Sequence, residues 1–233
     1  MAPATRAFTY SEWTLEGGRR ERAVAAAVAD SEAGDIVLLE MQTTCCGRSG
    51  FSPAETSQAI WLVVRTGADA GVVVVAAAGN GDEDLDSEPY EEYRERGDSG
   101  AIIVGAGDST IEHRKLSFST FGSRLTVQAW GQNVMTAGYG VCEFPGSEDV
   151  QRHYTPRYSG TSSASALVAG AVTAIQSYAQ NMLGERLGPE GMRTLLERTG
   201  LPQQGAEEDG TIGPFLQMRA AIEELRQRHK GSR

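Results

Sequence analysis

The sequence predicts an α/β fold built on a parallel sheet, because short apolar runs alternate with segments of helical periodicity. The clearest apolar run, residues 72–78, consists of valine and alanine only, opens after Gly71 and ends at Gly79. A similar run at residues 36–41 precedes it, with an amphipathic segment between the two. Uninterrupted apolar strands are typical of sheets that helices cover on both faces, and parallel strands need crossover helices of this kind.

The other elements follow in chain order. Apolar pairs four positions apart beside charged residues predict a helix over residues 19–30. After the strand at 36–41, a loop leads to Pro53, which suits the first turn of a helix expected over residues 54–69. Further strands are expected at residues 101–105 and 125–129, and further helices from near Ser162, at residues 189–198 and at residues 214–228. No internal repeat is evident.

Composition predicts one globular domain of acidic character. We expect the domain to span residues 17–228, between a loose N-terminal arm at 1–16 and a polar tail at 229–233. The net charge of −10 argues against nucleic acid and against an anionic membrane surface as partners. No apolar segment resembles a secretory signal or a membrane span, so we expect a cytoplasmic protein.

The cysteines and the acidic residues bear on cofactors. Cys45 and Cys46 are adjacent and Cys142 stands alone, so we expect three reduced thiols, with a bridge from Cys142 to one of the pair as the alternative. No metal-binding cysteine spacing is present, and we expect no cofactor. The acidic run at residues 82–86 is a candidate for calcium, because its carboxylates alternate, but a solvated loop is the simpler interpretation.

One stretch, residues 159–170, combines a polar start with a long run of small apolar residues. Ser-Gly-Thr-Ser at 159–162 precedes that run, which predicts a buried helix whose first turn stays accessible. The free N–H groups and the positive dipole end of such a turn face whatever lies there. A serine at this place can act as a nucleophile whose own N–H stabilises an oxyanion, although an ordinary N-cap is the alternative.

Asn80 lies between two glycines where the strand at 72–78 ends. Taken alone, this is a common turn signal. In parallel sheets, however, binding sites form where strands end at their carboxyl edges. Residues 43–50 and 79–81 both leave strands at that edge, so we expect them to line one cleft.

Four segments in the same order resemble those of the subtilisin-like serine peptidases. These are Ala-Ala-Gly-Asn at 77–80, Val-Gly-Ala at 104–106, Phe-Ser-Thr-Phe-Gly at 118–122 with the strand that follows, and Gly-Thr-Ser-Ser-Ala-Ser-Ala-Leu-Val-Ala-Gly at 160–170. The resemblance covers residues 36–180. It implies a three-layer subtilisin-like α/β fold with a mostly parallel sheet, lacking its N-terminal part.

The resemblance also implies roles for individual residues. Ser162 would be the nucleophile, and Asn80 would stabilise the oxyanion together with the Ser162 backbone N–H. A peptide would lie extended between residues 43–47 and 76–80, pairing through the backbone. The implied substrate-binding residues are Thr43, Thr44, Cys45, Ala78, Gly79 and Gly160. The two adjacent cysteines would lie at this pocket as redox-sensitive thiols or as small fillers.

The sequence departs from the family pattern most seriously in the triad. The family's Asp-Ser/Thr-Gly and Gly-His-Gly-Thr-His motifs are absent, and Ala166 and Trp130 stand where the family has proline. His153, nine residues before Ser162, is the candidate for a substitute base, with a surface-loop histidine as the alternative interpretation. We expect His113 and His229 to be solvated.

The sequence therefore predicts a serine peptidase of the subtilisin kind that cleaves peptide bonds through an acyl-enzyme at Ser162. Without a general base, a serine hydroxyl is a weak nucleophile. We expect the isolated chain to be incomplete, with an upstream chain supplying Asp and His and a peptide or protein as substrate. The alternatives are a catalytically inactive peptide-binding relative and a serine enzyme reused for other acyl transfer.

Overall fold

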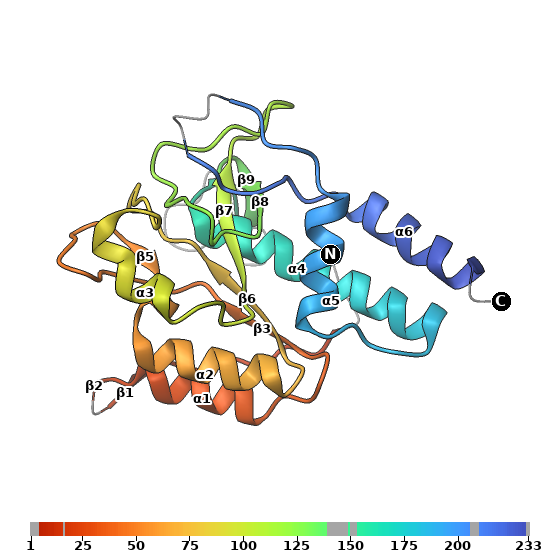
Figure 1. Cartoon of the computed structure of the whole chain (residues 1–233), viewed down its shortest axis with the longest axis horizontal. Coiled ribbons are helices and arrows are strands. Elements are labelled where there is room, and N and C mark those ends of the chain that lie inside the picture. The colour runs from red at the N-terminus through yellow and green to blue at the C-terminus, as the bar shows by residue number, and fades with distance from the viewer. Residues whose placement is uncertain (1–4, 16, 139–148, 150–152, 206–209, 232–233) are drawn as a thin grey trace.

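A parallel sheet forms the centre of the computed structural model, which describes residues 5–15, 17–138, 149, 153–205 and 210–231. Within those residues the sheet has four strands in the order β3–β6–β7–β8 (Figure 1). The strands are β3 (Ile36–Leu39), β6 (Val73–Ala77), β7 (Ile102–Gly107) and β8 (Val127–Trp130). Strand order follows chain order, so each connection leads to the neighbouring strand.

Helices cover both faces of this sheet, as the apolar strands predict. α1 (Arg20–Ala29) and α2 (Gln58–Asp69) share one apolar core with the sheet. α4 (Thr161–Leu183), α5 (Pro189–Thr199) and α6 (Met218–Gly231) share the other. Every residue of β6 and β7 is buried, because both strands lie between the two helical layers. The predicted three-layer α/β fold with a parallel sheet is confirmed.

The long helix α4 is the element that carries the site. Its buried apolar residues recur every three or four positions and face the strands β7 and β8; they include Ala164, Val168, Val172, Ile175 and Ala179. The helix starts after Gly160 and ends at Gly184, whose left-handed conformation stops it. The N-terminal turn of α4 is thereby held at the carboxyl edge of the sheet.

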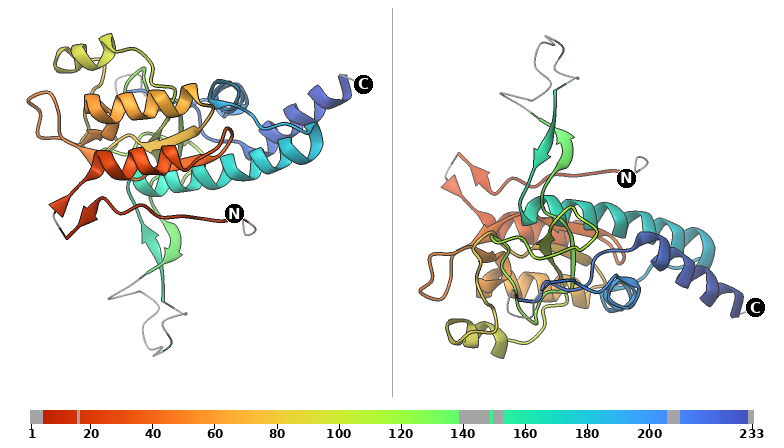
Figure 2. Two further views of the ribbon diagram at one scale, coloured as in Figure 1. Left: turned by 90° about the horizontal axis from the view of Figure 1, so that it is seen from below. Right: turned by 90° about the horizontal axis from the view of Figure 1, so that it is seen from above.

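Smaller elements surround the main sheet. The short strands are β1 (Trp13–Thr14), β2 (Gly17–Gly18), β4 (Gln42–Thr43), β5 (Ser52–Pro53), β9 (Val134–Ala137) and β10 (Tyr154–Tyr158), and they form antiparallel pairs β1–β2, β4–β5 and β9–β10. The short helices are η1 (Ala54–Thr56), η2 (Glu88–Tyr90) and α3 (Glu91–Glu95). The β9–β10 pair projects from the body of the molecule and leads into α4 (Figure 2).

Several boundaries differ from the predicted ones. Extended backbone at Ser57 divides the expected helix 54–69 into η1 and α2. The last helix begins at Met218 and not at 214, because Phe215 pairs through its main chain with Leu201. That helix continues to Gly231, into the expected tail, and the expected arm includes β1, which pairs with β2.

The expectation of three reduced cysteines is wrong for the adjacent pair. Cys45 and Cys46 form a disulfide in the loop between β4 and β5. Cys46 adopts a left-handed backbone conformation, with φ of 63°, and Gly47 after it has φ of 72°. The sequence rule that neighbouring cysteines rarely pair does not anticipate this local backbone. Cys142 lies outside the described residues.

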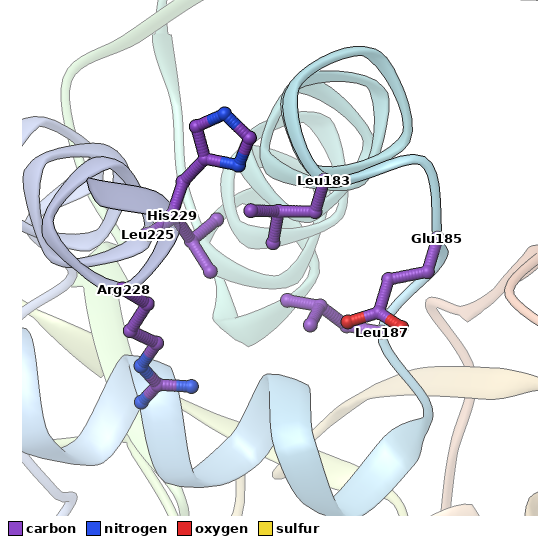
Figure 3. Close-up of a pocket in the computed structure, with 6 residues that line it drawn as sticks. All are labelled: Leu183, Glu185, Leu187, Leu225, Arg228 and His229. Carbon is purple, nitrogen blue, oxygen red and sulfur yellow. The ribbon is translucent and has the colours of Figure 1, made fainter. Parts of the chain in front are cut away.

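A small hollow of about 270 Å³ lies where α4 and α6 end (Figure 3). Leu183, Leu187 and Leu225 line it beside the charged Glu185 and Arg228, with the His229 ring at its edge. The 23 residues of α4 separate it from the first turn of that helix, by roughly 35 Å at 1.5 Å per residue. The hollow is therefore remote from Ser162. Among the described residues, no helix has the length and apolarity required to cross a membrane.

A buried ion pair joins η1 to the loop before β8. Glu55 is 1% exposed and accepts a bond from Arg124 at 2.9 Å, while the hydroxyls of Tyr93 and Ser99 each donate to its carboxylate at 2.5 Å. Burial of the phenol and the negative charge of Glu55 raise the pKa of Tyr93 well above its ordinary value. This cluster connects three segments that are distant in sequence.

We predict that Glu55→Ala lowers the free energy of unfolding by about 3–5 kcal/mol, because it leaves the buried Arg124 with only the half-exposed Asp98, at 3.4 Å, as a charged partner. Urea unfolding followed by circular dichroism measures the change. Glu92→Ala is the matched control: Glu92 also pairs with an arginine, Arg96, but is 82% exposed, and we expect a loss of about 0–1 kcal/mol. Equal losses for the two variants would contradict this assignment.

Candidate active site

Asn80 and the start of α4 meet at the carboxyl end of β6. The Asn80 side-chain oxygen Oδ1 accepts hydrogen bonds from the Thr161 backbone N–H at 2.8 Å and from the Thr161 hydroxyl at 3.0 Å. The backbone N–H of Gly79 in turn donates to the Thr161 hydroxyl at 3.1 Å. The two segments that the sequence singled out are thus joined directly, across 81 positions of chain.

This contact determines which way the Asn80 amide faces. Because Oδ1 accepts both bonds from Thr161, the Nδ2 donors point elsewhere. Among the contacts of the described residues, neither Asn80 Nδ2 nor the Ser162 backbone N–H has an acceptor. The Asn80 backbone N–H is held by the Gln42 side chain at 2.8 Å. Two donors beside Ser162 are therefore available to a ligand.

Gly160 allows this close approach. Its φ of 120° lies in a region that favours glycine, and a Cβ built on it would stand 3.3 Å from Asn80 Nδ2. Its backbone N–H donates to the Gly131 carbonyl at 2.9 Å, which ties the turn to the end of β8. Gly160 therefore shapes the wall next to the free amide donors.

Ser162 lies in the first turn of α4 and is half-buried. Its hydroxyl donates to the main-chain carbonyl of Glu40, at the end of β3, over a long 3.4 Å. The hydroxyl of Ser165, one turn further, caps the Ser162 carbonyl at 2.9 Å. In the described part of the chain, no imidazole or carboxylate bonds to the Ser162 hydroxyl. The geometry orients the serine but does not itself supply a proton acceptor.

Few main-chain N–H and carbonyl groups of residues 76–80 remain available for the predicted backbone pairing with a peptide. Ala76 and Ala77 pair within the sheet, and Ala78 N–H donates to Val104. The N–H groups of Gly79 and Asn80 are occupied as described above, and the Gly79 carbonyl accepts from Thr120. A peptide at this edge would have to rely on side chains and on other main-chain groups.

The loop at residues 43–51 packs against the Asn80 turn. A Cβ on Gly79 would meet the Phe51 carbonyl at 2.6 Å, and one on Gly81 would meet the Phe51 nitrogen at 2.0 Å. Thr43 is already paired with Ser52 in the β4–β5 ladder, and Thr44 and Cys45 lie at the loop that follows. The loop that contains Thr44 and Cys45 therefore borders the Asn80 turn through Phe51.

Sequence reasoning missed the residue that secures this loop, Glu83. Its buried carboxylate accepts from the Gly50 backbone N–H at 3.1 Å and pairs with Arg48 at 2.9 Å. From the sequence alone, we expect residues 82–86 to form a solvated or calcium-binding loop. A single sequence offers no signal for a contact 33 positions away.

The other carboxylates of the acidic run have protein partners too. Asp82 pairs with Lys115 at 2.6 Å, and Asp86 accepts from the backbone and the hydroxyl of Ser123. Asp84 accepts from the Asp86 backbone N–H at 2.9 Å. Among the described residues, no group of three or more His, Cys, Asp or Glu side chains is arranged to hold a metal ion.

The structure does not bring His153 to the serine. The His153 carbonyl accepts from Gly138, which places the residue at the outer end of β10, beyond the pairing of Tyr154 with Ala137. The five residues of β10 span roughly 17 Å of extended chain between His153 and the segment that enters α4.

Among the described residues, neither of the other two histidines forms a hydrogen bond with the Ser162 hydroxyl. His113 stacks on Phe215 with ring centroids 3.7 Å apart, and its burial lowers the pKa of the imidazole. It is therefore less solvated than expected. His229 lies in α6, at the hollow described above.

Thr161 is fully buried, and its hydroxyl both accepts from Gly79 and donates to Asn80. We predict that Thr161→Val destabilises the fold by about 1–3 kcal/mol, because the buried Gly79 N–H loses its acceptor. Chemical denaturation measures the loss. Thr161→Ser keeps the hydroxyl and should cost less; a serine variant as unstable as the valine variant would show that the bond is not the cause.

Known proteins resemble this chain in sequence and in fold. The subtilase family model matches residues 28–214. An extracellular protease of Xanthomonas campestris pv. campestris is 29% identical over 152 residues, which are 65% of this chain and 23% of that protein. A subtilisin-like protease of Coccidioides posadasii is 32% identical over 122 residues, which are 52% of this chain and 27% of that protein. The matches thus span about a quarter of each curated relative.

Solved structures show the same fold. A lanthipeptide protease superposes with a TM-score of 0.66 at 16% identity, over 93% of this chain and 69% of that one. Fervidolysin from Fervidobacterium pennivorans, described as a keratinolytic enzyme related to subtilisin, gives a TM-score of 0.62 at 23% identity, over 89% of this chain and 29% of that one. The resemblance deduced from the four segments is confirmed. Since the family model extends over well more than half of its residues, the chain belongs to the subtilase family.

Proposed function

We propose that this chain carries the nucleophile and the oxyanion hole of a serine peptidase that cleaves peptide bonds through an acyl-enzyme at Ser162. The observation that carries the proposal is the double hydrogen bond from Thr161 to Asn80 Oδ1. It leaves the Asn80 amide donors and the Ser162 backbone N–H unoccupied beside the serine hydroxyl. Fixed donors of this kind stabilise the charge that develops in acyl transfer.

The reaction follows from these positions. The Ser162 oxygen attacks the peptide carbonyl while its proton passes to a base, and the carbonyl oxygen gains the negative charge. Asn80 Nδ2 and the Ser162 N–H donate to that oxygen. The C–N bond then breaks as the base returns the proton to the leaving amine, and water hydrolyses the resulting ester by the same steps in reverse order.

In this proposal, the histidine and aspartate of a full triad come from a segment outside these 233 residues. Two observations support a missing segment. Within the described residues, β3 pairs on one side only, with β6. A groove of about 910 Å³ runs along that strand, one side of α4 and the N-terminal residues 5–10. The groove reaches Glu40 and Ala166, next to Ser162, so a segment that filled it would reach the serine.

A catalytically silent peptide-binding protein is the second candidate. The observation that favours it is the bond from the Ser162 hydroxyl to a main-chain carbonyl, which does not raise the nucleophilicity of the oxygen. Both candidates predict peptide binding at the Asn80–Ser162 edge, and they differ in whether the serine reacts.

We predict that the chain, supplied with an upstream polypeptide that carries the family's aspartate and histidine motifs, cleaves a peptide library and that Ser162→Ala abolishes the cleavage. Asn80→Leu should reduce turnover about 10²–10³-fold, a magnitude that comes from subtilisin itself, because the oxyanion loses a donor. Mass spectrometry of the products measures both effects.

Glu91→Gln serves as the control, since Glu91 is an exposed carboxylate on α3. Peptide binding by the complemented protein with no cleavage of any library member would favour the silent candidate. Cleavage that persists in Ser162→Ala would exclude the serine mechanism.

A further inference from the structure

Glu40 lies directly beside the nucleophile, at the point where β3 ends. Its main-chain carbonyl is the group to which the Ser162 hydroxyl donates, at 3.4 Å. The two residues are 122 positions apart in sequence, and none of the family motifs includes Glu40. Its carboxylate is therefore a titratable group at the site to which the proposed function gives no role.

The alternation of β3 directs the Glu40 side chain toward α4. Val37 and Leu39 belong to the apolar core on the α1–α2 side of the sheet. Ile36 packs against the core on the α4 side. Since side chains alternate along a strand, Glu40 continues the row of Ile36 and Leu38 and points to the face that α4 covers.

The groove along β3 agrees with this direction. Glu40 lines it together with Ala166 and Ala169 of α4. Ala166 lies one helical turn beyond Ser162, on the same side of the helix. The Glu40 side chain therefore has space within one helical turn of Ser162, which itself does not line the groove.

In the described part of the chain, no charged group shifts the pKa of the Glu40 carboxyl. Partial burial raises the pKa of the Glu40 carboxyl above its ordinary 4.5. The other charged groups along the groove are Arg6, Asp30, Asp35 and Arg186. Asp35 pairs with Arg186 at 2.8 Å, and Asp30 accepts from the Tyr10 hydroxyl, whose own pKa that bond raises. Across the strand end, α4 begins with uncharged residues, and its positive dipole end favours a nearby carboxylate.

We infer that the Glu40 carboxylate is the general base that activates Ser162 in this chain when no histidine is supplied from outside. The inference rests on the proposed function, since it assigns a proton acceptor to the same nucleophile. It predicts a slow acylation of the serine by the chain alone, which the complete triad of a full catalytic domain would exceed.

The step is balanced without a co-reactant. A Glu40 oxygen takes the Ser162 hydroxyl proton as the serine oxygen bonds to the electrophilic centre of the substrate or probe. For a peptide, the electron pair of the C–N bond leaves with the amine, which receives the proton back from Glu40. For an alkyl fluorophosphonate, the P–F bond breaks, fluoride leaves, and the proton stays on the carboxyl until it exchanges with water.

The test is the labelling rate of the purified chain by an alkyl fluorophosphonate, followed by mass spectrometry across pH. We expect wild-type labelling at Ser162 that rises with pH as the Glu40 carboxyl loses its proton, above the ordinary 4.5 of a glutamate. Glu40→Gln should slow labelling by about 10²-fold or more and remove this acidic limb, because the amide cannot accept the proton. Glu40→Asp should retain part of the rate.

Controls separate this effect from misfolding. Glu40 belongs to neither apolar core, so we expect its variants to unfold at the wild-type temperature, and Glu91→Gln to label at the wild-type rate. Ser162→Ala should not be labelled. Equal labelling of wild type and Glu40→Gln would overturn the inference, and so would a loss found in His153→Gln instead.

The outcomes also distinguish the inference from the proposed function. If the chain alone shows no labelling but cleaves peptides when the upstream polypeptide with the aspartate and histidine motifs is added, Glu40 is not a base and the peptidase assignment stands. If labelling of the wild type depends on Glu40 but no complemented form cleaves peptides, the inference that Glu40 activates Ser162 stands and the peptidase assignment fails.

Discussion

The pair of hydrogen bonds that Thr161 donates to Asn80 Oδ1 is the constraint on which the site depends. It joins the end of β6 to the start of α4 in a buried position, where water cannot compete for the donors. One side-chain oxygen is thereby fully engaged, and the amide donors of the same side chain must face outward. Gly160 and Gly79 permit this approach, since a side chain at either would enter space that the site already occupies.

The structure fixes the groups proposed to stabilise an oxyanion more firmly than any proton acceptor for the serine. The groups that would receive an oxyanion are held rigidly, because they belong to a buried helix start and a strand end in the core. Among the family motifs that the chain carries, none provides a proton acceptor for Ser162. The sequence contains segments that resemble the family's serine helix and asparagine strand, while neither the Asp-Ser/Thr-Gly nor the Gly-His-Gly-Thr-His motif occurs in it. Glu40 lies at the boundary, on the last strand before the open edge of the sheet.

The loop between β4 and β5 packs against the Asn80 turn, and side-chain contacts hold it there. Glu83, three residues after Asn80, holds this loop through Arg48 and the Gly50 backbone. The disulfide between Cys45 and Cys46 lies in the same loop. A carboxylate three residues after Asn80 therefore holds the loop that faces the asparagine turn.

The sequence alone determined the elements whose residues act locally: the apolar strand that became β6, the helix that became α4, and the candidates Asn80 and Ser162 at their ends. Strand burial and helix starts are readable because they depend on neighbouring residues and on short periods. The tertiary structure decided that Thr161 fixes the Asn80 amide, that Glu83 holds the opposite loop, that His153 lies out along β10, and that Glu40 stands next to Ser162. Most of these residues lie far apart in sequence, and His153 lies near Ser162 in sequence but away from it in space. Only the packing of the strands against α4 determines which of these side chains meet.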